Sequence, residues 1–362
     1  MRTLLAAVAL GTMLVASVAA AAPGTPTQYV RKTSGPVLAL AADGDRLALA
    51  VGGRRTGVGK RFIGCANVDL WEPTRRRVVQ FEAAAGCVPG YRTTTLAVAV
   101  AGTRVAWLRV GGSSERTETT VITATLGRRA PVPLARAISP DSIMGFFAMP
   151  PAGDGALLAF TLEQRCSEPQ FDPCPPGHKH FTLSSVWRVG GGGRCPWNSV
   201  AGNRRRPVGC SRVANADGEL TVLAVDAGRI VVRTEGGIRL LTQAGEVVRD
   251  IPLRGVRKAA LSGNRLAAKT AAAIHIYEAG SGSLSDRLAA SSPVTLEDLD
   301  RDILVTASGG TVTLRRLGDG RTATLHTSGV ARAQLEPPGL FIAGGRRVSF
   351  VPMREVLRRL RG

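Results

Sequence analysis

The chain has few aromatic residues and few histidines, and each shortage limits what it can be. Aromatic side chains make up 4% of the 362 residues, so any core depends on the Val, Leu, Ile and Ala within the 44% hydrophobic content. The only histidines are His178, His180, His275 and His326, which leaves little material for His-based catalysis. The Gly-x-Ser-x-Gly motif of serine hydrolases does not occur. We therefore find no catalytic signature and expect no cofactor.

Long apolar runs are also lacking, apart from one at residues 4–18. Arg2 precedes this run and four alanines, residues 19–22, follow it, which is typical of a secretory signal peptide. We predict a signal peptide over residues 1–22 and a single mature domain over 23–362. A retained signal anchor is the alternative, because the run approaches the ~20 residues of a membrane span. The favoured reading is a secreted or cell-surface monomer without a membrane span after cleavage.

Positive charge is abundant, with 47 basic residues against 27 acidic ones and a formal net charge of +20. A surface of this kind attracts polyanions such as anionic glycans, anionic lipid or wall polymers. An arginine-rich chain is equally what a GC-rich genome produces. The arginines alternate along predicted strands and do not cluster with aromatics, so we do not favour a nucleic-acid partner.

One unit recurs along the chain: an apolar strand, a tight turn with Gly, Asn or Asp, and a second apolar strand. A clear copy is VLALAADGDRLALAV at residues 37–51. In the last four copies a second hairpin follows, so each repeat holds four short antiparallel strands, here a to d in chain order. The period is 36, 37 and 37 residues between successive starts of strand b, at Arg229, Arg265, Asp302 and Gly339.

Four-stranded repeats of this length predict an all-β fold, a seven-bladed β-propeller of four-stranded antiparallel blades. A β-sandwich is the alternative, but it does not predict four consecutive copies at near-constant spacing. The pattern resembles exported WD-repeat-like and YVTN-type propellers, although the Gly-His and Trp-Asp dipeptides of true WD repeats do not recur. This resemblance implies a fold and no activity. The expected blades span residues 36–82, 93–135, 137–200, 219–252, 255–290, 293–327 and 329–361.

Closing the ring requires its two ends to meet. The segment 27–32 alternates like a strand and is expected to add the outer strand of the last blade. The segment 356–360 competes for that role or forms a short basic amphipathic helix.

The first three repeats break the period through four enlarged connections, which we assign to b–c and d–a links on one face of the ring. They span residues 52–66, 82–94, 163–181 and 201–216. All six cysteines lie in or beside them, which in an exported chain predicts three disulfides. The pairing we favour, although spacing alone leaves others open, is Cys65–Cys87, Cys166–Cys174 and Cys195–Cys210.

Two polar clusters invite a metal reading. Residues 166–180 contain cysteines and histidines, but they lack a Cys-x-x-Cys pair and an exported protein oxidises its thiols, so we expect no zinc site. The a–b turn of the sixth repeat contains four acidic residues that could attract calcium: Glu297, Asp298, Asp300 and Asp302. A solvated turn is the reading that we favour for them.

We expect a non-enzymatic binding or scaffold module whose disulfide-braced basic face takes an anionic glycan, a wall polymer or a protein partner. The alternative is a hydrolase or lyase at the mouth of the same face, with His178 or His180 as acid/base. The candidate binding residues lie in the enlarged connections: Arg54, Arg55, Lys60, Arg61, His178, Lys179, His180, Arg204, Arg205 and Arg206.

Overall fold

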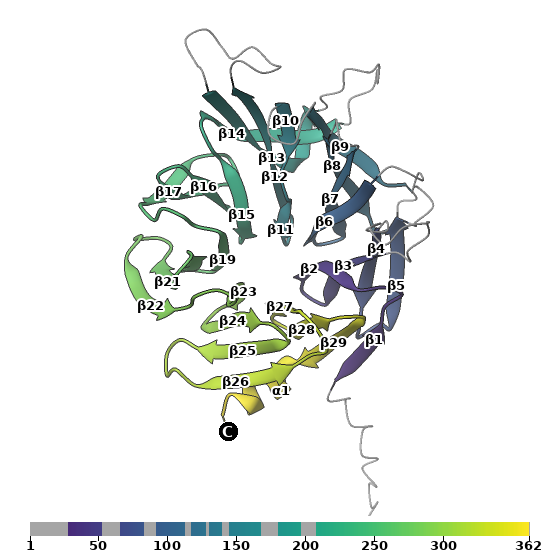
Figure 1. The fold of residues 1–362 in the computed structure, drawn as a ribbon, viewed down its shortest axis with the longest axis vertical. Coiled ribbons are helices and arrows are strands. Elements are labelled where there is room, and N and C mark those ends of the chain that lie inside the picture. The colour runs from purple at the N-terminus through teal and green to yellow at the C-terminus, as the bar shows by residue number, and fades with distance from the viewer. Residues whose placement is uncertain are drawn as a thin grey trace, which may run out of the picture.

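The chain is a seven-bladed β-propeller. The computed structural model describes residues 28–52, 66–82, 92–112, 117–127, 130–139, 145–167, 180–196 and 208–361. Within these ranges the strands form seven antiparallel sheets that are arranged as blades around a central axis (Figure 1). The fold that the repeat predicts is therefore confirmed.

Each blade is built outward from the axis in the order a, b, c, d. Strands a are β2 (Val37–Asp43), β6 (Arg92–Ala101), β11 (Ala152–Asp154), β15 (Thr221–Asp226), β19 (Lys258–Ser262), β23 (Thr295–Asp300) and β27 (Ala331–Glu336). Strands b are β3 (Arg46–Gly52), β7 (Arg104–Gly112), β12 (Leu157–Ser167), β16 (Arg229–Thr234), β20 (Arg265–Lys269), β24 (Ile303–Ser308) and β28 (Gly339–Gly344).

The outer half of each blade consists of strands c and d. Strands c are β4 (Ala66–Glu72), β8 (Thr117–Thr125), β13 (His180–Arg194), β17 (Gly237–Thr242), β21 (Ala273–Glu278), β25 (Thr311–Arg316) and β29 (Arg347–Pro352). Strands d are β5 (Arg77–Glu82), β9 (Val132–Ser139), β14 (Val208–Asp217), β18 (Val247–Ile251), β22 (Leu284–Ala289), β26 (Thr322–His326) and β1 (Tyr29–Lys32). In blade 3 a further strand, β10 (Gly145–Ala148), pairs with β12 beside β11.

The core lies between the blades. The described residues form seven apolar clusters, and each one joins two neighbouring blades. Strands b are buried on both faces for this reason, and the five residues from Leu47 to Val51 in β3 are completely shielded from solvent. Because such a strand reads as a continuous apolar run, the repeat is visible in the sequence.

The N-terminal strand closes the ring. β1 pairs antiparallel with β29, with Tyr29 opposite Phe350, so the first strand of the chain lies beside the last one (Figure 1). Arg31 of β1 forms an ion pair with Asp69 of blade 1, which ties the closing strand to both neighbours. The strand predicted for 27–32 is thus confirmed for Tyr29–Lys32, whereas the competing segment belongs to a helix, α1 (Met353–Arg359).

One of the four enlarged connections is not where the sequence predicts it. Residues 208–217 form β14, the outer strand of blade 3, so the long connection that ends at Val208 is a c–d link and not the d–a link that we expected. Strand d needs to bury only one face, and VGCSRVANAD therefore lacks the apolar run that marks inner strands. The other three connections do join strands b–c, d–a and b–c.

The predicted disulfide Cys195–Cys210 is confirmed. Its Cα atoms are 4.6 Å apart, and it spans 15 residues across the c–d connection of blade 3. Cys166 is disulfide-bonded as well. The pairing Cys65–Cys87 and the proposed partner of Cys166, Cys174, lie outside the described residues.

Candidate functional site

The seven innermost strands surround a cavity of about 250 Å³ on the axis. Most of the residues that line it precede the last residues of the strands a and the a–b turns, so it lies nearer than those turns to the face from which the d–a and b–c connections leave. We call this cavity the entry cavity and this side of the ring the entry face. A second cavity of about 220 Å³ adjoins it at the a–b turns and shares five lining residues with it. We call the second one the turn cavity.

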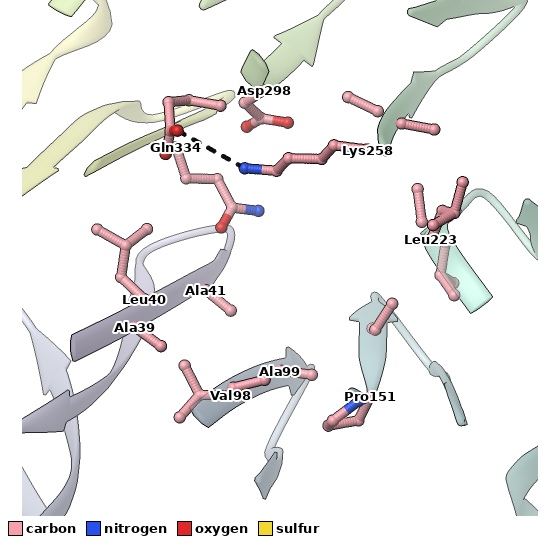
Figure 2. Close-up of a pocket in the computed structure, with 18 of the residues that line it drawn as sticks. Ala39, Leu40, Ala41, Val98, Ala99, Pro151, Leu223, Lys258, Asp298 and Gln334 are labelled. Atoms are coloured by element: carbon pink, nitrogen blue, oxygen red, sulfur yellow. Dashed lines mark ion pairs between the residues drawn. The ribbon is translucent and has the colours of Figure 1, made fainter. Parts of the chain in front are cut away.

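The entry cavity has an apolar half and a polar half. Blades 1 to 4 contribute only apolar residues and one glycine, among them Leu40, Leu96 and Leu223. Figure 2 shows Lys258, Asp298 and Gln334 close together on one side of the cavity, with Val98 and Pro151 across from them. The polar side chains all come from blades 5 to 7: Lys258, Glu297, Asp298, Arg332 and Gln334.

β-bulges in the inner strands shape this lining. Strands β2, β6, β15 and β23 each contain one residue that is skipped in the pairing with strand b. The skipped residues Leu96, Leu223 and Glu297 line the entry cavity. A bulge re-aims the side chain that it carries. Leu96 is 55% exposed as a result, which is unusual for a leucine on an innermost strand.

Glu297 and Asp298 reach across to the neighbouring blade. Glu297 Oε2 accepts a hydrogen bond from the Ala333 amide at 3.3 Å, and Asp298 Oδ2 accepts one from the Leu335 amide at 2.8 Å. The side chain of Glu297 is only 8% exposed and lies 3.8 Å from the amine of Lys258. Burial raises the pKa of Asp298 to about 7. The interpretation of this cluster as a solvated turn is therefore wrong for both residues.

The turn cavity is ringed by carboxylates. Strand a ends in an acidic residue in five blades, at Asp43, Asp154, Asp226, Asp300 and Glu336. Burial raises the pKa of Asp154, Asp226 and Asp300, and that of Glu336 reaches about 9, where the neighbouring carboxylates add to the effect of burial. Sequence reasoning missed this ring, although an acid at the last position of strand a recurs in the repeats.

These carboxylates hold neighbouring blades together. Asp226 Oδ2 accepts from the Gly263 amide at 2.8 Å, and Glu336 Oε2 accepts from the Gly44 amide at 3.0 Å. Each bond joins the end of one strand a to the a–b turn of the next blade. Among the described residues, no group of three or more His, Cys, Asp or Glu side chains is placed to hold a metal ion.

Most of the binding residues predicted from sequence cannot be placed in this geometry. Arg54, Arg55, Lys60 and Arg61, like His178, Lys179 and the side chain of His180, lie outside the described residues. The same is true of Arg204, Arg205 and Arg206. The strands on either side of them are c and d of blade 3, which are joined at the face opposite the entry face. Two other cations, Lys258 and Arg332, line the entry cavity. The sequence did not single them out as binding residues, because each is a single charge in an apolar strand.

The chain thus belongs structurally to the β-propellers, with the fold-level resemblance to WD-repeat propellers confirmed. No family model matches the chain, and no curated protein does either. The chain is similar to one in a crystal structure of the mitotic checkpoint complex, with a TM-score of 0.53 and 10% identity. The match covers 96% of this chain and 99% of that one. Sqt1 of Saccharomyces cerevisiae (TM-score 0.43, 10% identity, 90% of this chain and 97% of that one) also matches.

BamB from Moraxella catarrhalis gives a TM-score of 0.44 at 11% identity, over 89% of this chain and 99% of that one. The similarity to the chain in the mitotic checkpoint complex, at 10% identity, shows the fold alone. In the part of the chain that the structure describes, no helix has the length and apolar character needed to cross a membrane.

Proposed function

We propose that this chain is an extracytoplasmic, non-enzymatic binding propeller that takes a protein partner at the entry face. The observation that carries the proposal is the lining of the entry cavity, where exposed Leu96 lies in the same cavity as Lys258 and Arg332. An apolar centre beside polar groups that fix orientation is the usual composition of a binding site. A rigid ring also offers long connections a fixed scaffold.

The proposed location rests on two observations. Residues 1–22 have the pattern of a signal peptide, and the Cys195–Cys210 disulfide suits an oxidising compartment. Arg54 and Lys60 stand in the sequence between strands b and c of blade 1, and basic residues there would favour an anionic partner. Arg204 to Arg206 stand in the sequence between strands c and d of blade 3 and are not part of the proposed surface.

Site-specific photocrosslinking tests the proposal. A photoreactive residue in place of Leu96 should give a covalent adduct with a protein partner in the cells that export the chain. The matched control is Leu284, which is 53% exposed on the outer strand β22 and should give none. Adducts that are absent at position 96, or equal at both positions, would contradict binding at the entry face.

A hydrolase or lyase at the same cavity is the second candidate, and one observation favours it. The pKa of Asp298 is about 7, and a carboxyl with such a pKa can donate and accept protons near neutrality. Asp298→Asn keeps one of the two acceptors that the Leu299 and Leu335 amides use, and it should abolish turnover of an acidic polysaccharide; the melting temperature of the variant shows whether it is folded. Turnover that survives this substitution excludes Asp298 as the acid/base.

A further inference from the structure

The entry cavity is narrow enough to select the end of a chain. Its volume of about 250 Å³ is below the roughly 300–1,000 Å³ of pockets that hold drug-sized ligands. It lies on the axis of the ring, surrounded by all seven inner strands, so an occupant enters along the axis. A helix is about 10 Å wide and a loop needs room for two strands. A single extended terminus needs the least width.

The polar half of the cavity contains two cations, Lys258 and Arg332, beside the carboxyls of Glu297 and Asp298. Lys258 and Arg332 are both exposed, on β19 and β27 respectively. Within the described part of the chain Arg332 has no ion-pair partner, and Lys258 lies 3.8 Å from Glu297. Glu297 is already engaged, because it accepts hydrogen bonds from Thr295 and Ala333. Arg332 therefore remains available to a small anionic group, and Lys258, which lines the same cavity, adds to the attraction.

The other half of the same cavity is lined by apolar side chains. Leu40, Leu96 and Leu223 come from blades 1, 2 and 4, and Pro151 lies between the last two. A ligand that satisfies both halves has a carboxylate and an apolar group within a few ångströms of each other. The final residue of a polypeptide has both when its side chain is apolar. An internal acidic residue is a poorer fit, because the chain must continue out of the cavity on both sides of it.

We infer that the entry cavity binds the free C-terminus of a partner protein, with the α-carboxylate at Lys258 and Arg332 and an apolar last side chain against Leu96 and Leu223. This inference rests on the proposed binding function and names its ligand. Charge complementarity sets the orientation of the terminus, and the leucines re-aimed by the bulges select its last residue.

Peptide binding to the full mature chain tests the inference. The probe is a fluorescent hexapeptide with a polar body and a C-terminal leucine, measured by anisotropy as the free acid and as the amide. We expect saturable binding of the free acid. Affinity should fall at least tenfold on amidation, and also when the last residue is serine. Equal affinity for acid and amide overturns the inference.

Two substitutions locate the site. Arg332→Ser should lower the affinity for the free-acid peptide at least tenfold. The control is Arg321→Ser on the outer turn of blade 6, where the arginine is 56% exposed, and it should leave the affinity unchanged. Leu96→Asp should abolish binding and Leu284→Asp should not. Both target residues are exposed, so the melting temperature should change little. The comparison of the free-acid peptide with the amide uses the unmodified chain, so it remains a valid test even if one of the variants misfolds.

The outcomes separate this inference from the proposed function. If free-acid peptides do not bind but the photoreactive residue at position 96 still forms a protein adduct, the binding function stands and the C-terminal ligand is wrong. If dodecanoate binds and no peptide competes with it, the ligand is a lipid and the inference is overturned. If free-acid peptides bind and Arg332→Ser has no effect, the site lies elsewhere and the inference fails.

Discussion

At the scale of single residues, a short motif at the a–b turns connects one blade to the next. In blade 4, Asp226 accepts from the amide of Gly263 and Arg229 donates to the carbonyl of the same glycine. In blade 1, Asp43 and Arg46 hold the amide and carbonyl of Gly102 in the same way. An Asp-x-x-Arg sequence thus satisfies both backbone groups of a turn in the neighbouring blade. Such turns would otherwise rely on water for these bonds.

Glu336 makes stability depend on pH. Its pKa is about 9 in the folded chain and ordinarily 4.5, so between these values the folded state keeps a proton that the unfolded state has lost. Stability contributed by this proton is complete below about pH 4.5 and is lost as pH rises toward 9. Asp298, with a pKa of about 7, acts in the same direction over a narrower window.

Glu336→Gln should therefore flatten the fall in unfolding free energy between pH 5 and pH 9, measured by urea denaturation. Glutamine keeps an acceptor for the Gly44 amide and removes the titration. The control is Asp319→Asn, because the pKa of this exposed carboxyl is lowered and it is ionised in both states across that range. A slope that is the same in wild type and Glu336→Gln would contradict the assignment.

At the scale of elements, the closing strand β1 depends on one ion pair. Arg31 and Asp69 have side chains that are 18% and 9% exposed. Arg31 Nη1 and Asp69 Oδ1 lack hydrogen-bond partners among the described atoms. Each residue therefore depends on the other to compensate its charge. Removing one partner of a buried pair leaves an uncompensated charge, which is costly. The four residues of β1 thus join blade 7 to blade 1 through one charged contact, one strand pairing and the packing of Tyr29 against the apolar cluster between the two blades.

Arg31→Ala should lower the free energy of unfolding by about 3 kcal/mol, whereas a change at an exposed site costs within about 0.5 kcal/mol. Lys32→Ala, at the exposed next position of the same strand, is the matched control. Chemical denaturation measures both, and hydrogen exchange should show faster exchange in β29, which pairs with β1. Equal losses for the two variants would show that the ion pair does not hold the ring closed.

At the scale of the whole molecule, the ring separates charge along its axis. The described residues place Lys258 and Arg332 at the entry cavity, while five strands a end in acids around the turn cavity at the other end. The chain carries a formal net charge of +20, so a concentration of acids at one end of the axis is a local exception. Lys258 and Arg332 therefore attract an anionic chain end at the entry cavity, whereas the described residues that line the turn cavity include no basic side chain.

Much of the fold could be predicted from sequence because the repeat is a local pattern. Strands b begin at Arg229, Arg265 and Gly339, as the repeat predicts, and at Ile303, one residue after the predicted Asp302. The outer strand β14 was missed because a strand that buries one face carries little apolar signal. The same limit hid the c–d connection that the Cys195–Cys210 disulfide spans.

The candidate site could not be predicted in the same way. Gln334 bonds to the backbone of Ala42, and Glu336 to that of Gly44, across 292 residues of sequence. Lys258 and Arg332 share a cavity only because seven strands converge on one axis. The sequence by itself determined the blades, since periodicity and turn chemistry act over a few residues. The tertiary structure decided which side chains meet at the centre, because ring closure brings together residues that no local spacing relates.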